Sequence, residues 1–163
     1  VLMTPKSLLR HKLCASRLEE LVEGKFCSVI DDAEIESVES VRRIVLCSGK
    51  VYYDLLEARQ KNERVGGDIA LVRVEEIYPF PSAELGELLA RYERVEDVLW
   101  LQEEAKNMGA WSFVQPHIES LLPEQCELRY VGRDEAASPA TGSHQVHISE
   151  QREIVDQALD IQA

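Results

Sequence analysis

The sequence predicts an α/β fold, namely a compact three-layer α/β/α sandwich built on a mostly parallel sheet. Two observations support this prediction. Short apolar runs alternate along the chain with stretches of helical periodicity, and the connections between them are short. The runs are nearly continuous in Val, Ile and Leu, which is typical of strands buried on both faces. Right-handed crossovers between such strands place helices on both faces of the sheet.

Residues 1–40 have the weakest pattern, and we interpret them as a connecting segment ahead of an α/β core at 41–163. Val1-Leu-Met3-Thr-Pro resembles neither a signal peptide nor a natural initiation sequence, so we expect a piece of a longer polypeptide. The first helix should have Ser16 as its N-cap and Glu19 three residues later. In order, we expect a strand at 1–3, a helix at 16–22, a strand at 26–30 and an acidic loop at 31–40.

The core begins at Val41 and alternates regularly. Gly66-Gly67 should form a turn, and Tyr78-Pro-Phe-Pro81 a rigid connector that leads to a helix capped by Ser82. Pro116 has to sit early in its helix, because it lacks a backbone N–H. We expect strands at 44–47, 68–74, 97–102 and 128–131, and helices at 50–62, 83–92, 109–122 and 148–161.

Polar residues follow the predicted strands where ligands gather in open α/β sheets, at the carboxyl ends. We expect four clusters to converge there: Thr4, Ser48-Gly49-Lys50, Gln102-Glu103-Glu104 and Gly132-Arg133.

The turn Ser48-Gly49-Lys50 has two interpretations. It lacks the first glycine and the hydroxyl residue of a P-loop, so it is not a Walker-type phosphate site. It is either a tight turn with Lys50 solvated, or an anion site at a helix start assisted by Arg133.

The remaining motifs give weaker signals. Glu103 and Glu104 are adjacent in a loop, which suits capping or a subunit contact better than a catalytic pair. His144-x-x-His147 has metal-ligand spacing but no suitably placed third ligand, so we expect no metal site and no catalytic residue. Ser138-Pro-Ala-Thr-Gly142 is interpreted as a small-residue turn. Trp111 is expected in the core or at an interface.

Composition limits the function further. Of the residues, 45% are hydrophobic and 29% charged, as in ordinary globular domains, and no apolar run approaches the ~20 residues of a membrane span. The net charge of −12 argues against general nucleic-acid binding. Four dispersed cysteines suit reduced thiols in a cytoplasmic or matrix compartment, and Cys47, within an apolar run, is expected in the core.

Five motifs occur in an order that resembles a known family. They are Thr4-Pro-Lys-Ser-Leu-Leu-Arg10-His11, Cys47-Ser-Gly-Lys-Val-Tyr-Tyr-Asp-Leu55, Tyr78-Pro-Phe-Pro81, Gln102-Glu-Glu104 with Asn107-x-Gly109-x-Trp111, and Gly132-Arg133 with Ser138–Gly142. Together they resemble the C-terminal domain of the thiamine-diphosphate-dependent decarboxylating component of 2-oxoglutarate dehydrogenase, a transketolase-like enzyme. The likeness runs from Val1 to about Leu159; Ala105, where the family typically has proline or another residue, is one departure.

The resemblance implies a single C-terminal domain, 1–163, with a largely parallel five-stranded sheet and one antiparallel strand. It implies a homodimeric parent enzyme that uses thiamine diphosphate and Mg to decarboxylate 2-oxoglutarate. That enzyme passes the succinyl group to the lipoyl arm of a second component, in the bacterial cytoplasm or the mitochondrial matrix. The cofactor belongs to other domains, so this chain alone should bind none and be inactive.

Two roles for the domain itself follow from the resemblance. In the first, an anionic effector such as AMP or acetyl-CoA binds a pocket lined by Thr4, Arg10, Ser48, Lys50, Gln102 and Arg133. In the second, these residues tie the domain to the catalytic domains and the other subunit, with contacts from Glu103, Glu104, Asn107 and Trp111. A third hypothesis, a free-standing nucleotide-binding α/β module, is disfavoured by the strand-like start of the chain.

Overall fold

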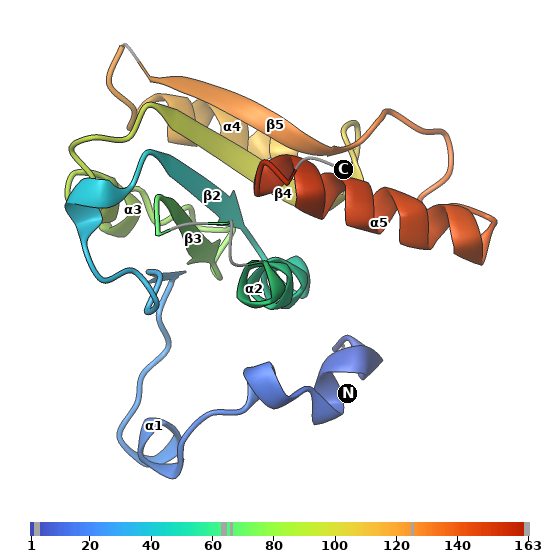
Figure 1. Ribbon diagram of the computed structural model, residues 1–163, viewed down its shortest axis with the longest axis horizontal. Coiled ribbons are helices and arrows are strands. Elements are labelled where there is room, and N and C mark those ends of the chain that lie inside the picture. The colour runs from blue at the N-terminus through green and yellow to red at the C-terminus, as the bar shows by residue number, and fades with distance from the viewer. Residues whose placement is uncertain (2–3, 63–64, 66, 125, 162–163) are drawn as a thin grey trace.

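A computed structural model describes residues 1, 4–62, 65, 67–124 and 126–161 of the chain. Its centre is a five-stranded sheet with the order β1-β3-β2-β4-β5 (Figure 1). The strands are β1 (Val29–Ile30), β2 (Arg43–Cys47), β3 (Ile69–Val74), β4 (Asp97–Ala105) and β5 (Glu127–Arg133). All neighbouring pairs are parallel except β1 with β3. The predicted α/β fold, with a five-stranded sheet and one antiparallel strand, is confirmed.

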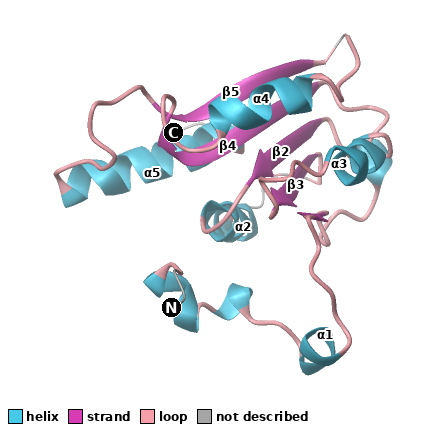
Figure 2. Cartoon of the chain, turned by 180° about the vertical axis from the view of Figure 1, so that it is seen from behind, coloured by secondary structure: helices cyan, strands magenta, loops and turns pink. Residues whose placement is uncertain are grey.

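Helices cover both faces of this sheet, which gives the predicted three layers. On one face the apolar cluster contains side chains of α3 (Ser82–Leu89) and α4 (Trp111–Glu119). On the other face it contains side chains of α2 (Val51–Lys61) and α5 (His144–Ala158), which Figure 2 shows from behind.

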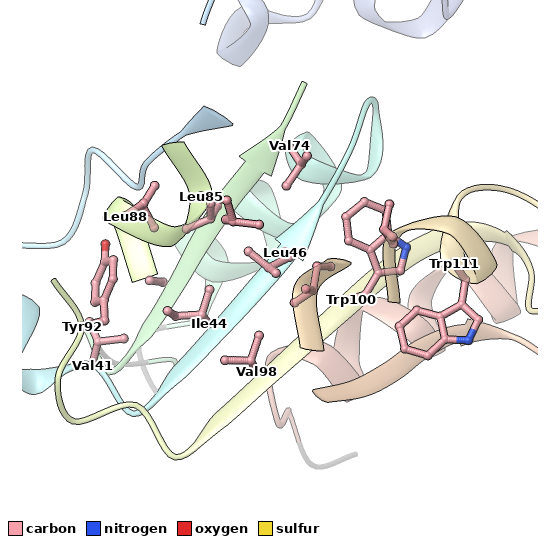
Figure 3. Close-up of a cluster of buried hydrophobic side chains, with 14 residues drawn as sticks. Val41, Ile44, Leu46, Val74, Leu85, Leu88, Tyr92, Val98, Trp100 and Trp111 are labelled. Atoms are coloured by element: carbon pink, nitrogen blue, oxygen red, sulfur yellow. The ribbon is translucent and has the colours of Figure 1, made fainter. Parts of the chain in front are cut away.

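Side chains of one strand alternate between the two clusters, as the pleat of a strand requires. Ile44 and Leu46 of β2 face α3 and α4, where Figure 3 shows them with Trp100 and Trp111. Val45 and Cys47 of β2 face α2 and α5. Burial raises the pKa of the Cys47 thiol to about 12, so this side chain is an inert core group as predicted.

Residues 4–28, which we call the N-terminal arm, extend away from the sheet in both ribbon views (Figures 1 and 2). The arm contains two 3₁₀ turns, Lys6–Arg10 and Lys12–Cys14, and the helix α1 (Leu18–Val22). The predicted cap of this helix is wrong by one residue: Arg17 is the N-cap, and its N–H donates to the Glu20 carboxylate at 2.9 Å. The strand expected at 1–3 falls largely on residues 2–3, outside the described residues.

Several element boundaries differ from the prediction for local reasons. Ser82 lies inside α3, whose N-cap is Pro81, and caps nothing with its side chain. Pro116 lies inside α4, beyond the first turn, although its missing N–H cannot pair with the Ser112 carbonyl. α5 starts at His144, four residues before the predicted start, because the Ser143 hydroxyl accepts from the Val146 N–H at 3.5 Å.

Two remaining segments complete the comparison. The loop predicted at 31–40 contains a short 3₁₀ turn, Val38–Ser40. Gly67 lies in a turn as predicted, whereas Gly66 is outside the described residues. Among the described helices, none has the length and apolar character needed to cross a bilayer.

Candidate functional site at the carboxyl edge of the sheet

The parallel strands β2, β4 and β5 end at one edge of the sheet, and three of the four predicted clusters meet there. β2 leads into a turn at Gly49, whose φ of +75° suits glycine, and then into α2 with Lys50 as N-cap. Because β2 and β4 are neighbours, the Lys50 ammonium reaches Glu103, with Nζ 2.6 Å from Oε1. The same ammonium lies 2.9 Å from Oδ2 of Asp54, one helical turn further along α2.

Arg133, at the end of β5, joins the same group. Its guanidinium donates to the Glu103 carbonyl, to Glu150 at 2.9 Å and to the Gln151 amide oxygen at 3.0 Å. The Gln151 amide donates in turn to Asp54 at 2.9 Å. These contacts form a closed ring of five residues, to which Glu150 is attached through Arg133. We call all six residues the edge network: Lys50, Asp54, Glu103, Arg133, Glu150 and Gln151.

The ion pairs of the edge network stabilise its charged forms. Burial lowers the pKa of Lys50, but hydrogen bonds to Glu103 and Asp54 outweigh burial and leave this pKa above its ordinary value. Hydrogen bonds from the Thr141 hydroxyl and from Arg133 lower the pKa of the half-buried Glu150. Lys50 is therefore half-buried and paired with two carboxylates of its own chain.

Gln102 is buried beneath this edge, and its amide is fully occupied within the chain. Its oxygen accepts from the Trp100 indole N–H and the Trp111 backbone N–H, both at 3.0 Å. Its nitrogen donates to the Met108 carbonyl at 2.8 Å and the Ala105 carbonyl at 3.2 Å. A Cβ at Gly109, where φ is +67°, would lie 2.9 Å from that nitrogen. Gln102 thus shapes the β4–α4 loop and offers no free group to a ligand.

The other predicted effector contacts, Thr4, Arg10 and Ser48, are not members of the edge network. Thr4 and Arg10 are exposed in the N-terminal arm, and within the described residues neither bonds to the edge network. Ser48 is half-buried in the turn before Lys50. The structure therefore brings Lys50 and Arg133 together but does not add Thr4 and Arg10 to them.

The predicted interface residues are largely engaged inside the chain. The Asn107 side chain exchanges two hydrogen bonds with the backbone of Ala136, at 3.0 and 3.1 Å. Trp111 is only 8% exposed and packs against Tyr130, with ring centroids 5.2 Å apart. Glu103 belongs to the edge network, and only the Glu104 carboxylate is exposed without such a role.

A cavity of about 490 Å³ lies beside Arg133, between the loop after β5 and α5. Four carboxylates line it, from Asp134, Glu135, Glu150 and Glu153. Its cation, Arg133, is already paired with Glu150. This excess of negative charge opposes the binding of a phosphate in this cavity.

Sequence reasoning missed a second charged group. It lies beside β3, just after the end of β1. Asp32 has a side chain that is 0% exposed and accepts from Arg59 of α2 at 2.5 and 3.0 Å. The same carboxylate accepts from the Leu71 N–H of β3 at 2.7 Å. Asp32 stands in a segment that the pattern marked as an acidic loop, and no local signal distinguishes it from its exposed neighbours.

Comparison with known proteins identifies the group to which the chain is similar. Residues 15–159 match the family described as 2-oxoglutarate dehydrogenase C-terminal. The chain is 46% identical over 161 residues to an oxoglutarate dehydrogenase of Buchnera aphidicola, covering 99% of this chain and 17% of the relative. To the 2-oxoglutarate dehydrogenase E1 components of Geobacillus and Haemophilus influenzae it is 48% and 44% identical, covering 98% of this chain and 17% of each relative.

Proposed function

Because the chain belongs to the 2-oxoglutarate dehydrogenase C-terminal family, we propose that it is the C-terminal domain of the enzyme's decarboxylating component. The proposed parent is a homodimer of the bacterial cytoplasm or mitochondrial matrix that acts in the tricarboxylic acid cycle. It decarboxylates 2-oxoglutarate and transfers the succinyl group to the lipoyl group of a second component. The chain spans 17% of the length of its relatives, which favours a domain over a free-standing nucleotide-binding module.

The residues that the structure describes do not fit the cofactor that such a parent needs. Thiamine diphosphate with Mg requires carboxylates or amides for the metal and unpaired donors for the diphosphate. Among the described residues, no group of His, Cys, Asp and Glu is arranged to hold a metal. Lys50 and Arg133, the cations of the edge network, are already paired with carboxylates. In the proposed parent, cofactor chemistry therefore takes place outside these residues.

We propose that the edge network has a structural role and does not bind an effector. The observation behind this proposal is that Lys50 and Arg133 each contact carboxylates of their own chain, at 2.6 and 2.9 Å. An incoming phosphate would have to displace Glu103 or Glu150, which both lie within hydrogen-bond distance of their cations. The same contacts join β4, β5, α2 and α5 at one edge, which gives the neighbouring domains and subunit a fixed face to pack against.

The test uses the full-length enzyme with Lys50→Ala and Arg133→Ala, made separately. In each variant we expect a lower melting temperature and a higher dissociation constant of the dimer. The ratio of activity with and without AMP, or with and without acetyl-CoA, should stay at its unaltered value. Arg152→Ala is the matched control, because Arg152 is 83% exposed and its ion pair in the described part of the chain is with Asp156, one turn along α5.

The opposite pattern would overturn the structural role. If both substitutions abolished the response to AMP or acetyl-CoA while the dimer and its melting temperature stayed unchanged, the edge network would be an effector site. Absence of 2-oxoglutarate decarboxylation by the unaltered full-length enzyme would instead refute the proposed parent activity.

A further inference from the structure

The N-terminal arm exposes apolar side chains to an unusual degree. Among the described residues, eleven large hydrophobic side chains are exposed, and six of them lie in the arm. They are Leu9, Leu13, Leu18, Leu21, Val22 and Phe26. Soluble chains leave single apolar residues exposed without consequence, but a run of them marks an interaction site. The arm is therefore the strongest candidate surface of the molecule.

Helix α1 concentrates three of these side chains on one face. Leu18, Leu21 and Val22 follow the i, i+3, i+4 spacing and are 70%, 74% and 74% exposed. Glu19 and Glu20 occupy other positions of the same helix. An amphipathic helix of this kind binds a groove through its i, i+3 and i+4 anchors. No groove of the α/β core receives it, since both ribbon views show α1 standing apart from the sheet (Figures 1 and 2).

The contact that the arm makes with the core uses a different part of it. The His11 ring lies 5.7 Å from that of Tyr53 on α2, and burial together with the neighbouring Cys14 side chain raises the pKa of Tyr53 to about 12. These contacts place the first half of the arm near α2 and leave α1 and Phe26 uncovered. The apolar face of α1 thus needs a partner beyond residues 29–163.

Charge and length indicate what that partner is. Residues 4–17 contain four cations and no carboxylate: Lys6, Arg10, Lys12 and Arg17. The partner surface should therefore be apolar where it meets α1, which carries Glu19 and Glu20, and acidic where it meets residues 4–17. The matching family describes a C-terminal region, and the chain spans 17% of its relatives, so most of a relative's length precedes the region that matches.

We propose that the N-terminal arm docks, through Leu18, Leu21 and Val22, on the part of the longer polypeptide that precedes this domain. This inference rests on the proposed function only in that the chain is a domain of a longer protein. It requires neither the decarboxylation nor the structural role of the edge network.

The test places a photo-crosslinker in the arm of the full-length protein, as Leu21→p-benzoylphenylalanine. Illumination is expected to produce cross-links to residues that precede the domain. Ile148→p-benzoylphenylalanine is the matched control, because Ile148 is 53% exposed on α5 and lies outside the arm. Products confined to residues 29–163, products with another protein only, or a yield equal to that of the control would overturn the proposal.

A second measurement guards against a variant that disturbs folding. In the full-length protein, Leu21→Ser should accelerate amide hydrogen exchange in peptides covering residues 15–28 by about tenfold, because one leucine anchor is lost. Ile148→Ser should leave those peptides unchanged. Fast exchange of the arm in the unaltered protein, with no effect of Leu21→Ser, would contradict docking. Activity is assayed in parallel, so failure of the docking and failure of the proposed enzyme activity remain distinguishable.

Discussion

Two charged groups flank the sheet, and they differ in burial more than in geometry. In the edge network, Lys50 and Glu103 approach to 2.6 Å with side chains 27% and 24% exposed. At the other edge, Asp32 and Arg59 approach to 2.5 Å with side chains 0% and 8% exposed. Water and salt screen the first pair, whereas loss of one partner in the second leaves a buried charge without compensation.

The comparison teaches that closeness alone does not rank ion pairs. The Asp32–Arg59 pair also satisfies the N–H of Leu71 at the edge of β3, where β1 has ended after two residues. It therefore replaces missing strand pairing as well as joining α2 to the segment before β2. The edge network joins four elements with weaker individual contacts, which suits a surface that another domain covers.

The largest expected effect comes from breaking the buried pair. Asp32→Ala should lower the free energy of unfolding by about 3–5 kcal/mol, because Arg59 keeps its charge in a buried position. Chemical denaturation followed by circular dichroism measures the change. Asp156→Ala is the control, since its partner Arg152 has a side chain 83% exposed, and it should cost less. Equal losses in the two variants would show that burial does not set the energy of these pairs.

A smaller effect is expected at Gln102, an uncharged side chain that is buried beneath the edge network. Gln102→Leu leaves the indole N–H of Trp100 and the backbone N–H of Trp111 without their acceptor. We expect a loss of about 3 kcal/mol, from the cost of buried unsatisfied donors. Gln115→Leu is the matched control, because that amide donates to Glu119 at an exposed site. A loss no greater than that of the control would refute the role of Gln102 in holding the loop.

The smallest effect concerns Asp97, which pairs with Arg43 and Arg129 at the amino end of β4. Burial raises its pKa, but hydrogen bonds from Arg129 and Arg43 outweigh burial and place this pKa below its ordinary value. Its stabilisation is therefore complete above the unfolded pKa of about 3.9 and is lost as pH falls through the folded pKa.

Asp97→Asn should accordingly destabilise the protein by about 1 kcal/mol at pH 7 and by less at pH 3. Unfolding by urea at several pH values measures the difference. A loss that stays constant from pH 7 to pH 3 would contradict an ionised Asp97 as the origin of the stabilisation.

The sequence was sufficient for the fold because its signal is local. The apolar runs at 44–47 and 68–74 correspond within one residue to β2 and β3, and each run is buried over nearly its whole length. The meeting of Lys50 with Glu103 also follows from topology, since both stand just beyond neighbouring parallel strands. Wherever the order of the strands could be predicted, the side chains that meet at the strand ends could therefore be predicted as well.

The rest depended on contacts between distant residues. Burial of Asp32 requires Arg59, which lies on a helix 27 positions away, so no window of sequence reveals it. The expected anion pocket rests on cations and a helix start that meet at the strand ends, whereas Glu150 and Asp54 approach those cations from helices whose rotation the pattern leaves open. Thr4 was placed with the strand ends because of a strand at 1–3 that the described residues do not test.

Calorimetric titration of AMP and of acetyl-CoA into this chain, and into its Lys50→Ala and Arg133→Ala variants, tests the structural role most directly. Because Lys50 and Arg133 are already paired with Glu103 and Glu150, we predict no saturable heat for any of the three proteins. Saturable binding by the unaltered chain that disappears in both variants would contradict this account and identify the edge network as an anion site.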